Sequence, residues 1–270
     1  MPKLKISKKQ LLIILPIVLV LIGTVVFFVN KNKKVAAPVV TSTKKKIQSP
    51  VNVIPVSERP YLRLEPTSDG RNIVITVAEV KKTASQLDYE MEYQTGSMLQ
   101  GFGGLIKLDK LPVSDKKLFG SQSAGGAITY HEDIKGGNFL AQFTGGESYA
   151  VKSAWRYFEN NIKASEFSSQ DTKFIINNQD LSKYSYIVIY NSPGYPEGLK
   201  GDLISDLYVV GVEKSLKTIS SDFEVSIRAS EEGQMMGYDG SKWQKMDSTY
   251  SEGLVKAKGP AMDVYAVVKK

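Results

Sequence analysis

The stretch from Leu87 to Tyr93 reads LDYEMEY, and its apolar side chains occupy every second residue. Successive side chains of a β-strand point to opposite faces of the sheet, so this alternation predicts a strand with one buried and one solvated face. The stretch from Phe223 to Ala229 alternates in the same way. Both stretches therefore predict half-buried antiparallel strands.

Two further stretches are apolar on both faces. Residues 72–80 read NIVITVAEV and residues 184–190 read YSYIVIY, and both are rich in β-branched and aromatic residues. Such a composition favours central strands, which are covered on both sides. Turn signals separate the strands, at 68–70, 103–104, 136–137, 145–146 and, most clearly as a hairpin, Asp239-Gly240. This pattern predicts an all-β sandwich and not an α/β fold.

An internal similarity suggests a division of this β region into two modules. GNFLAQFTGGESYAV (137–151) and GLVKAKGPAMDVYAV (253–267) share five of fifteen residues at an offset of 116, which favours a tandem duplication. Both stretches are predicted to be closing hairpins. We expect β-sandwich modules at 61–165 and 166–270, each the size of an immunoglobulin-like or fibronectin-type domain. The Cys and Trp signature of antibody-type domains is missing, so no family is inferred.

The N-terminus predicts a membrane anchor. Residues 11–29 read LLIILPIVLVLIGTVVFFV, without a charge, and as a helix they would span roughly 28 Å of lipid. A cleaved signal peptide is the alternative, but the charged run 30–34 follows the apolar segment where a small-residue cleavage site would be needed. We expect a cytoplasmic basic tail (1–10), an uncleaved signal anchor (11–29), a Lys/Pro-rich linker (30–60) and an extracytoplasmic C-terminal part.

The charge distribution argues against nucleic-acid binding. The whole chain carries a net charge of +7, but residues 1–60 hold ten lysines and Arg59 against the single acid Glu58. The remaining 24 basic and 27 acidic residues leave the β region slightly acidic. A basic nucleic-acid-binding face therefore loses its support. The absence of cysteine excludes disulfides, thiolate metal sites and a lipid-modified cysteine.

Five arrangements invite a catalytic or metal-binding interpretation, and none has a specific pattern. Ser123 and the single histidine, His131, do not fit G-x-S-x-G, and His131 with Glu132 and Asp133 gives only a partial metal site. Glu90 and Glu92 have the separation of a glycosidase acid–base pair, as any E-x-E on a strand does. Irregular Ca²⁺ sites are conceivable at Asp202/Asp206 and at Asp239/Asp247, without the linear motif. We therefore expect no cofactor, no metal and no catalytic residue.

Aromatic residues give the best candidates for binding. Tyr195 lies in the Pro-rich loop 191–198, and Tyr238 and Trp243 flank the Asp-Gly turn. Exposed Tyr and Trp side chains bind sugars and proteins, although packing in a core is the competing explanation. The sequence thus favours a membrane-anchored envelope protein with a non-catalytic binding, adhesion or structural role toward a glycan or protein. The alternative is a membrane-anchored hydrolase that acts on envelope or exported glycan or peptide material.

Overall fold

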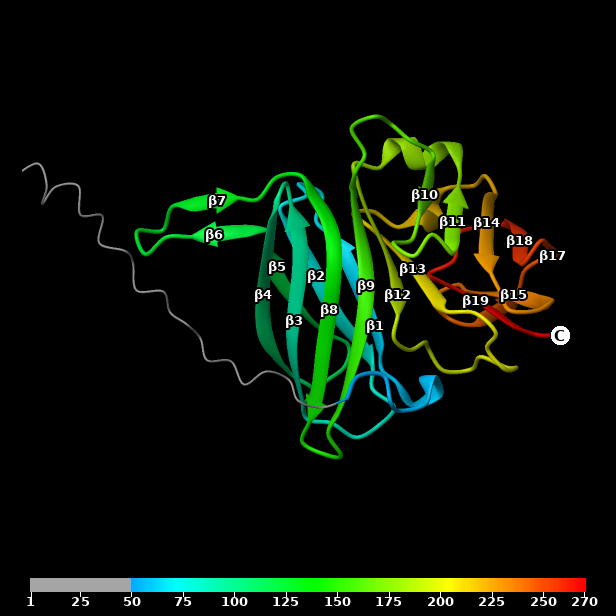
Figure 1. The fold of residues 1–270 in the computed structure, drawn as a ribbon, viewed down its shortest axis with the longest axis horizontal. Coiled ribbons are helices and arrows are strands. Elements are labelled where there is room, and N and C mark those ends of the chain that lie inside the picture. The colour runs from blue at the N-terminus through cyan, green and yellow to red at the C-terminus, as the bar shows by residue number, and fades with distance from the viewer. Residues whose placement is uncertain (1–49) are drawn as a thin grey trace, which may run out of the picture. The chain divides into compact units, whose positions relative to one another are not determined.

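The computed structural model describes residues 50–270, and its regular elements are β-strands and short 3-10 helices (Figure 1). The predicted tail (1–10), the predicted anchor (11–29) and linker residues 30–49 lie outside the described residues. Among the described residues, no helix is long and apolar enough to cross a membrane. The 3-10 helices are η1 (Val56–Glu58), η2 (Gln179–Lys183) and η3 (Leu216–Thr218).

Nine strands form one sheet, in the order β16-β15-β19-β13-β12-β9-β8-β3-β4, with antiparallel neighbours. Its strands are β3 (Gln86–Thr95), β4 (Met98–Lys107), β8 (Ile134–Thr144), β9 (Tyr149–Glu159), β12 (Tyr186–Ser192), β13 (Leu207–Val212), β15 (Gly233–Tyr238), β16 (Trp243–Lys245) and β19 (Val264–Lys269). This sheet is the central element of the described fold.

Three smaller sheets complete the described structure. One has the order β1-β2-β5, with β1 (Tyr61–Pro66), β2 (Asn72–Glu79) and β5 (Val113–Leu118). Another has the order β10-β11-β14-β18-β17, with β10 (Glu166–Ser168), β11 (Phe174–Asn177), β14 (Phe223–Arg228), β18 (Leu254–Gly259) and β17 (Ser248–Ser251). The hairpin of β6 (Gly120–Gln122) and β7 (Ile128–Tyr130) projects from the sheets (Figure 1).

The middle of the large sheet is buried on both faces. In β12, Val188 and Tyr190 belong to the hydrophobic core shared with β1 and β2, while Ile187 and Ile189 belong to the core under the five-stranded sheet. In β13 and β19, alternate side chains likewise belong to the two different cores. The described structure is therefore layered at its centre, and the prediction of an all-β, sandwich-like fold is confirmed.

Two close contacts fix β1 against this central region. The buried Tyr190 hydroxyl donates to the carbonyl of Leu62 (2.9 Å) and accepts from the amide of Leu64 (3.3 Å). In β13, a Cβ added at Gly211 would lie 1.9 Å from the carbonyl oxygen of Leu64. Only glycine allows the two backbones to approach this closely.

The predicted strands agree with the observed ones, but two predicted turns are wrong, because Gly103-Gly104 lies within β4 and Gly136-Gly137 within β8. The alternating stretches correspond to β3 and β14, and the two-sided stretches correspond to β2 and β12, which have neighbours on both sides. The Asp239-Gly240 turn joins β15 to β16, and Tyr238 pairs with Trp243 across it. These strands could be predicted from the spacing of the apolar residues, because that spacing reflects burial directly.

The two halves of the chain share the large sheet. Strand β9 pairs with β12, so the sheet continues across the predicted boundary between 61–165 and 166–270. That boundary, and the immunoglobulin-like tandem organisation, stay predictions. The first repeated stretch does form the β8–β9 hairpin. The prediction of a second closing hairpin is wrong, because β18 and β19 lie in different sheets.

Candidate functional site

The structure brings the three predicted binding residues together. The Trp243 ring lies 6.2 Å from the Tyr195 ring and 5.5 Å from the Tyr238 ring, measured between centroids. Tyr238 in turn packs edge-on against Tyr61, at 6.5 Å. Tyr195, Tyr238 and Trp243 are each half-buried, so they pack against the core and still present ring surface to solvent. We call Tyr61, Tyr195, Tyr238 and Trp243 the aromatic cluster.

Hydrogen bonds hold the Tyr195 loop in place. The Trp243 Nε1–H donates to the carbonyl of Pro196 (3.1 Å), and the amide of Glu197 donates to the Glu79 carboxylate (3.0 Å). Gly194 lies against the backbone carbonyls of Arg59 and Pro60, where a side chain has no room. The loop is therefore pre-organised, which lowers the entropy cost of binding a ligand.

A lysine covers one side of the cluster. The Lys81 ammonium lies 4.0 Å from the centre of the Tyr195 ring, a cation–π contact. Burial lowers the pKa of Lys81, while the carboxylates of Glu79 and Glu197 act in the opposite direction. Lys81 is therefore held over the Tyr195 ring, beside the carboxylates of Glu79 and Glu197.

An open groove of about 670 Å³ begins at Trp243. Its wall includes Met236, Gln234 and four lysines, namely Lys200, Lys245, Lys269 and Lys270. Lys269 and Lys270 pair with Glu231 and Glu232, respectively. Within the described residues, Lys200 and Lys245 have no carboxylate partner, so the groove presents two uncompensated cations next to an aromatic ring.

The residues that suggested hydrolysis do not converge. Ser123 lies in the turn of the β6–β7 hairpin, where its carbonyl accepts from Gly126. His131 Nδ1 is hydrogen-bonded to the Tyr93 hydroxyl, 2.9 Å away, on the buried side of β3. Glu90 and Glu92 alternate with buried residues and point to the opposite side of that strand. These groups therefore form no common acid–base set.

Two of the four carboxylates considered for Ca²⁺ have other partners. Asp206 pairs with Lys173 at 3.3 Å, and the side chain of Asp239 accepts hydrogen bonds from Ser241, Lys242 and Gln244 within its own turn. Those bonds hold the pKa of Asp239 well below its usual range. In the part of the chain that the structure describes, no group of three or more potential metal ligands occurs.

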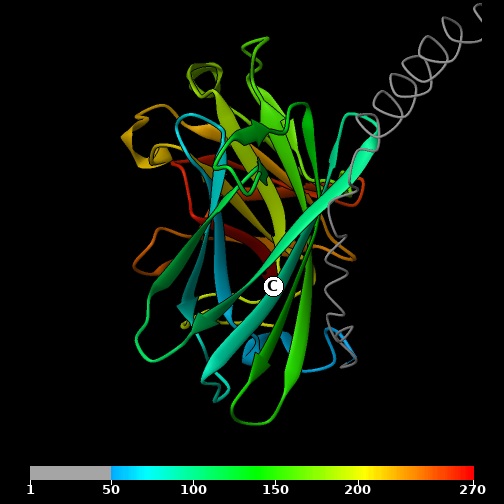
Figure 2. The ribbon, with the colours of Figure 1, turned by 90° about the vertical axis from the view of Figure 1, so that its left-hand side faces the viewer.

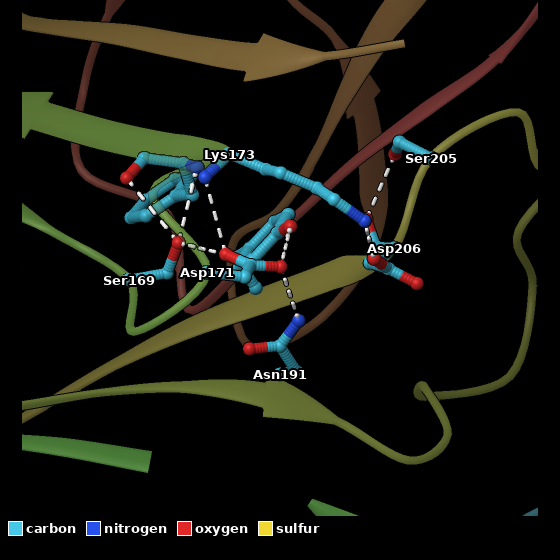
Figure 3. Close-up of polar contacts among 8 residues, drawn as sticks. Ser169, Asp171, Lys173, Asn191, Ser205 and Asp206 are labelled. Carbon is cyan, nitrogen blue, oxygen red and sulfur yellow. Dashed lines mark hydrogen bonds and ion pairs between the residues drawn. The ribbon is translucent and has the colours of Figure 1, made fainter. Parts of the chain in front are cut away.

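The carboxylate of Asp171 accepts several hydrogen bonds and links the five-stranded sheet to the large sheet (Figure 3). Asp171 accepts hydrogen bonds from the Ser169 hydroxyl, the Asn191 amide (3.0 Å) and the Tyr208 hydroxyl (2.9 Å). It also accepts from the backbone amide of Lys173 (3.1 Å). Burial alone would raise the pKa of Asp171, but these hydrogen bonds outweigh it and lower the pKa. Because these donors occupy the carboxylate, we assign Asp171 a structural role.

This arrangement predicts an acid-sensitive contribution to stability. A carboxyl group with a lowered pKa in the folded state stabilises the fold above the unfolded-state pKa, and this contribution disappears as the pH falls through the folded-state pKa. We expect Asp171→Asn to lower the urea midpoint at pH 7 and to have less effect near pH 3. Glu224→Gln, at an exposed residue of β14, is the control. A pH-independent difference between Asp171→Asn and the native chain would contradict this assignment.

Comparisons with known proteins provide no relative. No protein-family model matches this chain, and a search of curated proteins found no match. The case for a function therefore depends on the described geometry.

Several parts of the site were not predicted from the sequence. Tyr61, Lys81 and the lysines of the groove come from elements far apart in the chain, and no local pattern connects them. Strand β4, an edge of the described sheet, does have a local signal, because Leu99, Gly101, Gly103 and Leu105 share one face of the strand.

Proposed function

We propose that this protein is a membrane-anchored, extracytoplasmic binding protein with a non-catalytic role at the cell envelope. In this proposal residues 11–29 form the anchor, the linker 30–60 joins the anchor to the β region, and the β region faces away from the cytoplasm. The modules 61–165 and 166–270 are tandem units joined through the shared sheet. The aromatic cluster and the adjoining groove form the contact site.

The observation that carries this proposal is the convergence of Tyr195, Tyr238 and Trp243 beside a lysine-lined groove. Aromatic faces stack on sugar rings, and lysines without a carboxylate partner attract carboxylate or phosphate groups. An acidic glycan of the envelope combines both chemical features. The hydrolase alternative has no comparable support, because Ser123, His131 and the Glu90/Glu92 pair do not converge.

Binding to acidic glycans tests the proposal directly. Full-length protein in detergent is titrated with a panel of neutral and acidic envelope polysaccharides, and Trp fluorescence is recorded. The chain has two tryptophans, and Trp155 is fully buried, so a ligand-induced change reports on Trp243. We expect binding of an acidic polymer that weakens with added salt.

Substitutions in the contact site provide the matched comparison. We expect Tyr195→Ala and the double change Lys200→Ala/Lys245→Ala each to weaken binding by at least tenfold, which corresponds to about 1.4 kcal/mol. Tyr250→Ala is the control, since Tyr250 is an exposed tyrosine on β17, in another sheet. Equal loss with Tyr250→Ala, or no binding by any acidic polymer, would contradict the proposed site.

The anchor is tested separately, in intact cells. We expect the chain to remain with the membrane fraction after high-salt washing, and the β region to be cleaved by protease added outside the cytoplasmic membrane. A chain that lacks residues 11–29 should be released from the membrane. Protection of the β region from external protease would reverse the proposed orientation.

A further inference from the structure

Strand β4 forms an unprotected edge of the large sheet (Figure 1). All ten of its residues pair with β3, without a register shift, and among the described strands none pairs with its other side. Leu99 and Leu105 expose 66% and 53% of their surface. The strand contains no proline, and its only charge is Lys107 at the end. A long, regular, apolar edge of this kind is a template for pairing with another strand.

The other sheet edges are protected. Strands β16, β10 and β17 at three other edges, and both strands of the β6–β7 hairpin, have three or four residues each. The edge strand β5 carries the adjacent lysines Lys116 and Lys117, and β1 is fastened to the large sheet through Tyr190. Short length, lysines and coverage are the usual means of preventing edge pairing. Strand β4 has ten residues, its single lysine is its last residue, and no described strand pairs with its outer side. Figure 2 views the end of the molecule where β4 lies.

The sequence of β4 is nearly symmetric about Phe102. Gly101 and Gly103 flank it, and Leu99 and Leu105 lie three residues to either side. In an antiparallel pair of two β4 strands centred on Phe102, Leu99 of one copy faces Leu105 of the other. Lys107 then faces Ser97, so no like charges are opposed. This symmetry points to a second copy of the chain as the occupant.

Backbone geometry is compatible with that register. The two-residue turn Gly96-Ser97 joins Thr95 to Met98, and such turns are flanked by a hydrogen-bonded pair. By alternation, Leu99, Gly101, Gly103 and Leu105 then direct their amide and carbonyl groups away from β3. These are the four residues that face one another in the symmetric register. Phe102 occupies the non-hydrogen-bonded position on the twofold axis.

The acidic side chains of β3 do not prevent this pairing. Asp88, Glu90 and Glu92 lie on one face of β3, one strand inside the edge. In the paired sheet, the two β3 strands are separated by three inter-strand spacings, about 14 Å. That separation exceeds the Debye length of about 8 Å at physiological ionic strength, so their repulsion is largely screened.

We propose that β4 pairs with β4 of a second copy, antiparallel and centred on Phe102, and so joins two nine-stranded sheets into one. Disulfide trapping tests this register, because the chain has no cysteine and each crosslink must come from an introduced residue. Leu99→Cys and Leu105→Cys are made separately in the full-length chain and mixed under mild oxidation. We expect the mixture to form a covalent dimer, since facing residues in an antiparallel pair have Cα atoms about 5.5 Å apart.

Matched controls test whether the disulfide could form through random collision of two exposed thiols. Leu99→Cys alone should not crosslink, because two copies of residue 99 lie six residues apart along the paired strands, about 20 Å. Mixing Leu99→Cys with Ile162→Cys should not crosslink either, although Ile162 is 88% exposed. Crosslinking of Leu99→Cys with itself, or with Ile162→Cys as readily as with Leu105→Cys, would overturn the proposed register.

A charge exchange gives a second, independent measurement. The double variants Leu99→Lys/Leu105→Lys and Leu99→Glu/Leu105→Glu each place like charges opposite one another, so each is expected to sediment as a monomer. Their mixture pairs Lys with Glu and should restore the doubled mass, which also shows that both variants are folded. Ile128→Lys, at an exposed apolar residue of β7, should leave the dimer unchanged. Failure of the mixture to associate, or dimers formed by either variant alone, would refute β4 pairing.

Discussion

A fragment that ends at residue 165 is expected to remain unfolded, with no cooperative melting transition. The core between β1, β2 and the large sheet includes side chains from the second half of the chain. These are Val188, Tyr190, Leu207, Val209, Val264 and Ala266. At about 1.5–3 kcal/mol for each large buried side chain, their absence removes roughly 10 kcal/mol. That loss is comparable to the whole stability of a typical domain, about 5–15 kcal/mol.

The measurement is circular dichroism with thermal melting of fragment 50–165. Fragment 50–270 is the control, because it contains the buried members of both cores. We expect this control to retain β structure and to melt cooperatively. Cooperative melting of fragment 50–165 would instead establish the first module as an independently folding unit.

The substitution Gly211→Ala is expected to destabilise the protein by about 3 kcal/mol or more. The added Cβ would lie 1.9 Å from the carbonyl oxygen of Leu64, a backbone atom that cannot rotate away. Relief of this overlap requires β1 to move off β13, which disturbs the hydrogen bonds of Tyr190 to β1. Overpacking of a well-packed core typically costs about 1–3 kcal/mol, and a backbone clash falls at or above that range.

Urea unfolding of the full-length protein measures this loss as a lower midpoint. Gly125→Ala is the matched control, since the nearest atom to its added Cβ is the Ser123 hydroxyl at 3.9 Å. We expect Gly125→Ala to change the free energy of unfolding by less than about 0.5 kcal/mol, as is usual for surface substitutions. Equal midpoints for Gly211→Ala and the native protein would show that β1 does not pack on β13 as described.

The contact site shows what local patterns can and cannot predict. Tyr195, Tyr238 and Trp243 could be selected from sequence because each lies in or beside a turn with aromatic content. Their grouping could not be predicted, since it depends on the 191–198 loop reaching the β15–β16 hairpin through the bond from Trp243 to Pro196. Tyr61, a member of the cluster, and Lys81, which contacts it, come from the other half of the chain. The sequence therefore carries no local signal for them.

The amino-acid sequence by itself determined the secondary structure of β2, β3, β12 and β14, because the period of apolar residues records directly which faces are buried. Only the tertiary structure decided which strands are neighbours. Strand pairing depends on contacts between residues far apart in the chain, and similar alternating strands are compatible with many orders. Tertiary structure thus placed β9 beside β12, separated β18 from β19 and left β4 at an open edge. Both the aromatic cluster and the proposed pairing surface arise from that arrangement.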